Sequence, residues 1–261
     1  MSNENQRKFP KAIAAHISGP YRVENIGRSD SEVLIFSEHV LKIEKTTEQS
    51  DSEHKMLLWL DGKLPAPRVI AFERENEYNY LLMTKQSGKM ACDCGLPEET
   101  VSRLLAEGLQ MLWKTDISDC PVRFDMKALL TEAKKQTENG FLEGLTPQNG
   151  EFPDFEILYR YLSENIPQEE FVFSHGDYCL PNIFVSEKEV CGFLDLGSAG
   201  VSDRYRDIHM CLWSMRYNFV TLGGMEEDRF ARCRRIFFET LGIKENEEKL
   251  RYFSLLDEFF V

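Results

Sequence analysis

The chain has 261 residues, of which 42% are hydrophobic and 29% are charged, a balance typical of a globular protein of one large or two modest domains. No apolar run approaches the ~20 residues of a membrane helix, and residues 1–19 lack the apolar core of a signal peptide, so neither feature is expected. The net charge of −13 would repel a phosphate backbone and argues against a nucleic-acid partner.

Residues 1–86 have the pattern of a small mixed lobe with a sheet of about five strands and one inserted helix. A polar turn at residues 27–31 joins the first two strands, and Pro65 and Pro67 prevent the inserted helix from continuing. The predicted helices are residues 9–17 and 50–60, and the predicted strands are residues 21–26, 32–36, 39–44, 68–74 and 78–84.

Residues 87–96 are polar, contain glycine and are predicted as a hinge, which makes residues 97–261 the second lobe. This second lobe is mainly helical around a short strand–turn–strand centre at residues 171–197. Its predicted helices are residues 98–114, 124–137, 154–163, 203–219, 226–241 and 245–260. The fold class is therefore α+β with two lobes, and a cleft between two such lobes commonly binds a nucleotide.

The centre of the second lobe carries the most informative side chains, which are His175, Asp177, Asn182 and Asp195. Two carboxylates and an amide at this spacing suit phosphoryl transfer from Mg-ATP to a hydroxyl group. Asp177 is placed to align and deprotonate the hydroxyl, while Asn182 and Asp195 hold magnesium. Asp and Asn are also ordinary turn formers, so each residue taken singly could simply form a turn. We expect His175 to hold the loop rather than to shuttle a proton.

In the first lobe, Lys42 lies within an apolar strand and Glu53 lies on the helix that follows. A buried lysine needs an anionic partner, and a pair with Glu53 would fix its ammonium against the α- and β-phosphates of ATP. The alternative is a strand lysine that faces solvent by alternation.

Residues 93–170 hold 16 Asp or Glu against 7 Lys or Arg, a local charge balance of −9. This surplus is either a solvated surface or an acidic trough that concentrates a cationic substrate. The seven cysteines are odd in number and scattered, which favours a reducing cytoplasm over a disulfide framework.

Taken together, these residues resemble the aminoglycoside phosphotransferases, and among them the 3′-O-phosphotransferases of the kanamycin and neomycin kinase type, which share a protein-kinase-like fold. The resemblance covers nearly the whole chain. Its most specific stretches are MLLWLDGKLPAPRV at 56–69, FSHGDYCLPNIFV at 173–185, GFLDLG at 192–197, DRYRDI at 203–208 and LLDEFF at 255–260.

The resemblance implies roles for individual positions. His175, Asp177 and Asn182 match the catalytic pattern, Asp195 matches the magnesium-binding aspartate, and Lys42 and Glu53 match the phosphate-binding lysine and its partner. The positions that match the adenine hinge are Met83, Thr84 and Gln86, those that match the floor beneath the base are Phe184 and Leu194, and Val40 falls where relatives place an aromatic ring over the base. Glu258 matches a glutamate that helps to hold the aminoglycoside amines.

Several positions depart from the pattern that this resemblance implies. Ser198 replaces an arginine, so one active-site cation is missing. Trp213, Tyr217 and Asn218 stand where some relatives have an arginine and two acidic residues. Val261 follows the phenylalanine at which such relatives end. These changes alter the acceptor pocket and leave the transfer machinery in place.

The resemblance therefore implies an ATP- and Mg²⁺-dependent kinase that phosphorylates and inactivates an aminoglycoside antibiotic, with GTP not excluded as donor. The expected partner is a small polycationic substrate, and the expected state is a cytoplasmic monomer or weak dimer. The alternatives are a kinase of another small hydroxylated molecule, such as choline, a sugar or an amino alcohol, and a non-catalytic nucleotide-binding protein.

Overall fold

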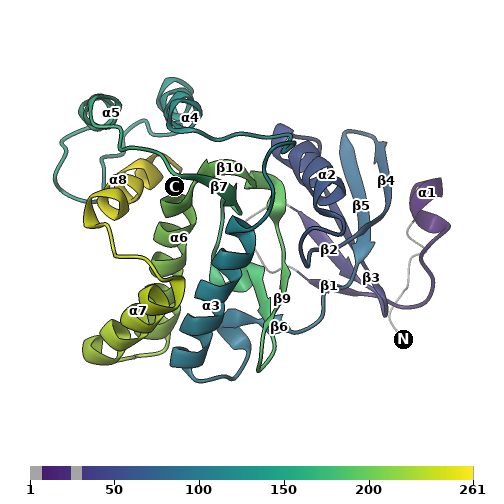
Figure 1. Cartoon of the computed structure of the whole chain (residues 1–261). Helices are drawn as coiled ribbons and strands as arrows, with labels where there is room; N and C mark the ends of the chain where they lie inside the picture. Colours follow the sequence, from purple (N-terminus) through teal and green to yellow (C-terminus); the bar gives the residue numbers. More distant parts are fainter. Residues whose placement is uncertain (1–7, 25–30, 261) are drawn as a thin grey trace.

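The computed structural model describes residues 8–24 and 31–260. A sheet-containing lobe and a larger, mainly helical lobe lie side by side, which confirms the predicted α+β class (Figure 1). Within the described ranges, no helix is long and apolar enough to cross a membrane.

The first lobe is built on an antiparallel five-stranded sheet with the strand order β1-β2-β3-β5-β4. Helix α2, Glu48–Leu60, is inserted between β3 and β4, so the predicted sheet with one inserted helix is confirmed. The helix starts two residues before its predicted start because Thr47 and Ser50 form a reciprocal capping box. The strands are β1 Arg22–Glu24, β2 Glu32–Ile35, β3 His39–Lys45, β4 Val69–Glu75 and β5 Tyr78–Thr84.

Two predictions for this lobe have different outcomes. Helix α1 spans only Lys11–Ala14, shorter than the predicted 9–17, because Pro10 has an extended backbone and proline also disfavours a helical conformation in the residue before it. The predicted turn at 27–31 lies outside the described residues except for Ser31.

The predicted hinge contains regular structure that the sequence pattern did not indicate. Strand β6, Lys89–Met90, pairs with Phe184 and Val185 of β8, and the 3₁₀ turn η1 follows at Ala91–Asp93. A two-residue strand has too few side chains for a period-2 pattern, and its pairing comes from a distant part of the chain.

The second lobe contains helices around two small antiparallel sheets, β7 with β10 and β6 with β8 and β9. Its helices are α3 Glu98–Trp113, α4 Met126–Glu138, α5 Phe155–Glu164, α6 Arg204–Arg216, α7 Glu227–Leu241 and α8 Glu247–Asp257, with 3₁₀ turns η2 Leu180–Asn182, η3 Leu196–Ser198 and η5 Glu258–Phe260. Its remaining strands are β7 Phe171–Ser174, β8 Ile183–Val185, β9 Val190–Phe193 and β10 Gly200–Asp203. Two differences from prediction stand out: β10 was not predicted, and α6 ends at Arg216, where a π-helix, Tyr217–Leu222, takes over.

One apolar cluster joins the two lobes. Met56, Leu57 and Leu60 on α2 belong to the same buried cluster as the side chains of α3. Helix α2 also packs against η3, and the Phe193 N–H donates to the Pro65 carbonyl at 2.9 Å. The predicted site residues on β3, α2, η2 and β9 are therefore carried by lobes that pack directly on each other.

Candidate active site

The loop that follows β7 is held from beneath by one buried carboxylate. Asp207, on α6, accepts hydrogen bonds from Ser174 Oγ at 3.0 Å and from the backbone N–H groups of His175 at 2.8 Å and Gly176 at 2.9 Å. Burial raises the pKa of Asp207, and His175, Arg206 and the two N–H groups oppose that shift. The carboxylate thus fixes the backbone immediately before Asp177.

Two further hydrogen bonds attach the same loop to helices α3 and α6. The buried hydroxyl of Tyr178 donates to the Leu105 carbonyl at 2.8 Å, and the Leu180 N–H donates to Ser214 Oγ at 3.0 Å. A loop anchored to both α3 and α6 presents its side chains in a fixed geometry, which catalysis by positioning requires.

Asp177 and Asn182 face each other across this loop. The Asn182 side-chain amide donates to Asp177 Oδ2 at 2.9 Å and to the Asp177 carbonyl at 3.1 Å. Because the NH₂ group is used in these bonds, the amide oxygen of Asn182 remains as the acceptor end of the side chain.

Asp195 stands at the end of β9 with half of its side chain exposed. Its backbone is left-handed, with φ of 55°, which is uncommon for a residue other than glycine and clusters at functional sites. The preceding Leu194 N–H donates to the Asn182 carbonyl at 2.8 Å, so the residue before Asp195 is tied to the segment that carries Asn182.

Lys42 extends from the first lobe toward Asp195. Its ammonium lies 2.7 Å from Glu53 Oε2, 3.4 Å from Asp195 Oδ1 and 3.4 Å from Glu44 Oε2. Burial alone would lower the pKa of Lys42, but the three carboxylates outweigh burial and raise it well above its usual range. The lysine is therefore a fixed cation, and the predicted pair with Glu53 is present.

A magnesium ion fits the oxygen atoms that this arrangement offers. The amide oxygen of Asn182 and the half-exposed carboxylate of Asp195 are hard donors of the kind that Mg²⁺ prefers, and phosphate oxygens and water complete its shell in nucleotide sites. Among the described residues, no group of three or more His, Cys, Asp or Glu side chains has the arrangement of a metal site. A two-donor site is therefore suited to metal that arrives with a nucleotide.

The residues predicted to contact the base come from both lobes. Met83 pairs with Val40 in the sheet, and the Thr84 N–H donates to the Arg68 carbonyl at 2.9 Å. The Gln86 side-chain amide donates to the Cys191 carbonyl, so this side chain braces β9. From the second lobe, Phe184 and Leu194 are half-buried.

His175 is completely buried and makes few polar contacts. Its Nδ1 accepts a long bond, 3.4 Å, from the Asp177 N–H, and its ring packs edge-on against Tyr178 and Phe193. Within the described part of the chain, its Nε2 has no hydrogen-bond partner. This position beneath the loop fits a structural role.

The residue predicted to hold the acceptor amines, Glu258, makes hydrogen bonds within the protein. Glu258 accepts from the backbone N–H groups of Gln148 at 2.6 Å and Asn149 at 3.0 Å, and from the Asn149 side chain at 3.1 Å. It therefore organises the loop between α4 and α5. Val261 lies outside the described residues.

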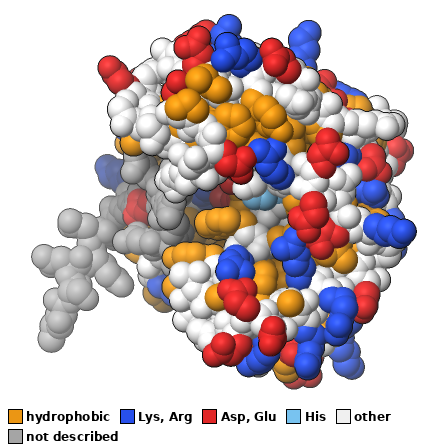
Figure 2. All heavy atoms as spheres, turned by 90° about the vertical axis from the view of Figure 1, so that its left-hand side faces the viewer, with side chains coloured by type: hydrophobic (Ala, Val, Ile, Leu, Met, Phe, Trp, Pro, Cys, Tyr) orange, Lys and Arg blue, Asp and Glu red, His pale blue; other side chains and the backbone are white. Residues whose placement is uncertain are grey.

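The positions at which the chain differs from the relatives' pattern lie in different environments on and after α6. Trp213 and Tyr217 are exposed, whereas the Asn218 side chain donates to the Ser214 carbonyl at 2.8 Å. The Ser198 carbonyl accepts from Arg206 at 3.2 Å. Figure 2 views the molecule from the side of these helices and shows hydrophobic side chains gathered around a hollow, with charges of both signs at its rim.

Sequence reasoning assigned no role to Asp207, Arg206 or Glu44. Asp207 had a sequence signal, because a carboxylate between the apolar positions of a helix is buried only when donors meet it. Arg206 lacked such a signal, since its neighbour Ser198 comes from another element. Glu44 lies two residues from Lys42 on the same strand, where alternation puts both side chains on one face of the sheet.

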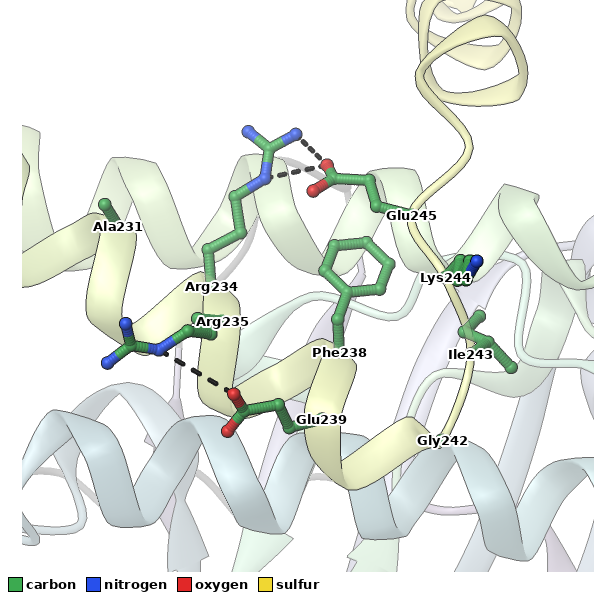
Figure 3. A pocket seen from close by; sticks show the side chains of 9 residues that line it. All are labelled: Ala231, Arg234, Arg235, Phe238, Glu239, Gly242, Ile243, Lys244 and Glu245. Atoms are coloured by element: carbon green, nitrogen blue, oxygen red, sulfur yellow. Dashed lines mark hydrogen bonds and ion pairs between the residues drawn. The ribbon is translucent and has the colours of Figure 1, made fainter.

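A separate hollow is formed by α7 and the segment after it (Figure 3). Its arginines are paired, Arg234 with Glu245 and Arg235 with Glu239. None of its lining residues belongs to the predicted site.

Comparison with known proteins gives a consistent result. The family model described as "Phosphotransferase enzyme family" matches residues 25–251. Aminoglycoside 3′-phosphotransferases from Staphylococcus aureus and Enterococcus faecalis are 35% and 37% identical to the chain, over 92% and 82% of it and over 90% and 80% of their own lengths.

Solved structures share the fold at lower sequence identity. An aminoglycoside phosphotransferase from Streptomyces rimosus in complex with ADP and streptomycin superposes with a TM-score of 0.78 at 20% identity, covering 94% of both chains. An aminoglycoside 3′-phosphotransferase of type VIII gives a TM-score of 0.77 at 21% identity, covering 95% of this chain and 98% of the other.

Proposed function

This chain belongs to the phosphotransferase enzyme family, and from that premise we propose that it transfers the γ-phosphoryl group of ATP to a hydroxyl of an aminoglycoside antibiotic and so inactivates it. The 3′-phosphotransferase relatives that are more than 30% identical over most of the chain support both the acceptor and the position of transfer.

The observation that carries the proposal is an unbroken series of contacts among the predicted residues. Lys42 contacts Asp195, whose neighbour Leu194 bonds to Asn182, and Asn182 in turn bonds to Asp177. A cation, two oxygen donors and a carboxylate thus come together from two lobes at one place, as phosphoryl transfer requires.

Each side chain takes a role that follows from its surroundings. Lys42, held by Glu53, binds the α- and β-phosphates, and Asn182 with Asp195 binds Mg²⁺. When bound, this metal neutralises charge on the phosphate oxygens. The Asp177 carboxylate accepts the proton of the acceptor hydroxyl as the new O–P bond forms and the bond from phosphorus to ADP breaks. Positioning carries most of the rate, because the transition state is loose.

The proposal that the acceptor is an aminoglycoside rests on the charge of the chain as well as on its similarity to the relatives. A net charge of −13, with a local balance of −9 over residues 93–170, favours capture of a polycation. We further propose lobes at residues 1–86 and 97–261 with a hinge at 87–96, and a monomer or weak dimer that acts in the cytoplasm without nucleic acid.

One observation favours a second candidate, a choline or amino-alcohol kinase. Trp213 and Tyr217 stack in parallel on the surface, and aromatic faces bind quaternary ammonium groups. The same transfer machinery would serve such an acceptor, so only the acceptor distinguishes the two candidates.

A nucleotide-coupled assay with kanamycin, neomycin and choline side by side tests the proposal. We expect ADP release with the two aminoglycosides and none above background with choline. Asp177→Asn, which preserves the size of the side chain, should lower kcat by at least about a hundredfold while the Kd for ATP changes little. Turnover with choline alone would establish the second candidate. Absence of turnover with every acceptor would favour a non-catalytic nucleotide-binding protein.

A further inference from the structure

The ammonium group of Lys42 is surrounded by carboxylates. Its Nζ lies 2.7 Å from Glu53 Oε2 and 3.4 Å from both Glu44 Oε2 and Asp195 Oδ1. A lysine ammonium has three N–H donors, so three carboxylates can occupy every direction in which it could bind a phosphate. One cation and three carboxylates also give the group a net negative charge, which opposes the entry of an anionic triphosphate.

Two of the three carboxylates have a role that remains when a nucleotide is bound. Glu53 projects from α2, and its side chain is only 5% exposed, so it can stay on Lys42 from the buried side. Asp195 is half-exposed at the end of β9 and is a proposed magnesium ligand, so a metal that arrives with the nucleotide compensates its charge.

Glu44 has neither kind of compensation. It lies two residues from Lys42 on β3, so both side chains point to the same face of the sheet. Within the described ranges, Lys42 is the one cation that pairs with its carboxylate, which is 18% exposed. Burial raises the pKa of Glu44, and the attraction of Lys42 opposes that shift. The ionised form of Glu44 therefore depends on its contact with Lys42.

From these observations, and resting on the proposed function, we propose that Glu44 competes with the nucleotide phosphates for Lys42 and so lowers the affinity of the site for ATP and ADP. In the empty site Glu44 helps to neutralise the lysine. When phosphate oxygens take its place, Glu44 loses its cation and adds a repulsive charge beside the bound nucleotide.

The competition has two consequences that depend on the charge of the ligand. Free ATP carries more negative charge than its magnesium complex, so Glu44 disfavours the metal-free nucleotide more strongly. After transfer, Glu44 can recover its contact with Lys42, which favours the departure of ADP. Glu44 is therefore expected to select metal-bound ATP and to keep product binding weak.

Glu44→Gln provides the test, because it removes the charge and keeps the size of the side chain. Binding is measured by calorimetry at pH 8, well above the usual range of a carboxyl group. We expect the Kd for ATP and for ADP to fall about threefold to tenfold. The fall should be larger for ATP in excess EDTA than in excess magnesium. The Kd for adenosine, which has no phosphate, should change less than about twofold.

Glu75→Gln is the matched control, because Glu75 is an exposed carboxylate at the end of β4 in the same lobe and its loss changes the net charge equally. It should leave all of these Kd values unchanged. If Glu44→Gln does not fold, Glu44→Thr removes the same charge with a residue that suits a strand, and it should lower the Kd for ATP and ADP in the same way.

The sign of the change decides between two roles. A higher Kd for ATP in Glu44→Gln would mean that Glu44 holds Lys42 in place for the phosphates, and it would overturn the proposal. An unchanged Kd, or an equal change for adenosine and ATP, would overturn it as well.

These measurements need no acceptor, which separates this inference from the proposed function. If the wild type binds ATP but phosphorylates neither kanamycin nor neomycin, the proposed function fails, and the ratio of the Kd values still decides the role of Glu44. A wild type that binds neither ATP nor ADP would overturn both.

Discussion

Replacing Lys42 by methionine is expected to destabilise the protein more at pH 8 than at pH 5.5. The ammonium lies among Glu53, Asp195 and Glu44, and Glu53 is almost completely buried. In the wild type, the raised pKa of Lys42 provides stability that is fully present below about pH 10 and is lost only above it. The contribution of the lysine itself is therefore constant between the two pH values.

The variant behaves differently because Glu53 loses its cation. Burial already raises the pKa of Glu53 in spite of the attraction of Lys42, and without that attraction the pKa rises further. A carboxyl group whose pKa is higher in the folded state contributes stability below about pH 4.5, and this contribution is lost as the pH rises through the folded pKa. The penalty in Lys42→Met therefore grows from pH 5.5 to pH 8.

Breaking a buried ion pair costs about 3–5 kcal/mol, which we expect for the loss in free energy of unfolding at pH 8. At pH 5.5 the loss should be smaller, because the raised pKa of Glu53 favours its protonated form at the lower pH. Urea unfolding followed by circular dichroism at both pH values measures the difference. Lys45→Met is the control, because Lys45 is exposed at the end of the same strand. A Lys42→Met penalty identical at the two pH values would refute the reasoning.

Three further predictions concern the second lobe. Asp195→Ala should weaken magnesium-dependent ATP binding about tenfold or more without weakening magnesium-free binding, and calorimetry that finds no change would exclude Asp195 as a ligand. Asp207→Asn should lower the free energy of unfolding by about 3 kcal/mol, because one amide oxygen cannot serve three donors, and a urea titration that finds a loss below about 1 kcal/mol would contradict this. Gly176→Ala should lower kcat at least about a hundredfold, because the new Cβ would collide with the Ser198 carbonyl oxygen at a φ of 83°. Gly144→Ala, with a φ of 77° and open space around the new Cβ, should retain the wild-type kcat in the same steady-state assay.

The fold was predictable where long periodic segments carried the signal. Helices such as α3 and α7 were found nearly to the residue, because their apolar side chains recur at helical spacing over four turns. Strands β6 and β10 were missed, because each has at most four residues and forms only when a partner distant in sequence pairs with it. The π-helix was missed for a related reason, since side-chain spacing continues smoothly from α6 through residue 219 while the hydrogen bonds change.

The sequence indicated the carboxylates of the site but not how they are supported. Asp177, Asn182 and Asp195 were predictable because turn formation alone rarely produces an ordered set of metal donors at this spacing. The buried support by Asp207 depends on contacts between elements far apart in the chain, whereas the additional partner Glu44 is two residues from Lys42 on β3. Glu258, which the resemblance singled out, accepts hydrogen bonds from the backbone of a neighbouring loop, and the sequence did not indicate these bonds.

Helix α6 carries a buried carboxylate of the candidate site at one end and an exposed aromatic side chain further along. Asp207, in its first turn, holds the loop that presents Asp177, and Trp213, about 9 Å further along the axis, lies on its exposed surface. Since one helix carries both, the distance between the loop that presents Asp177 and the Trp213 side chain is set by the helical backbone. Exposed positions on such a helix can change without disturbing the buried ones, because surface substitutions away from buried networks have small effects on stability. Divergence of Trp213 and Tyr217 from the relatives' pattern is therefore compatible with an unchanged transfer site.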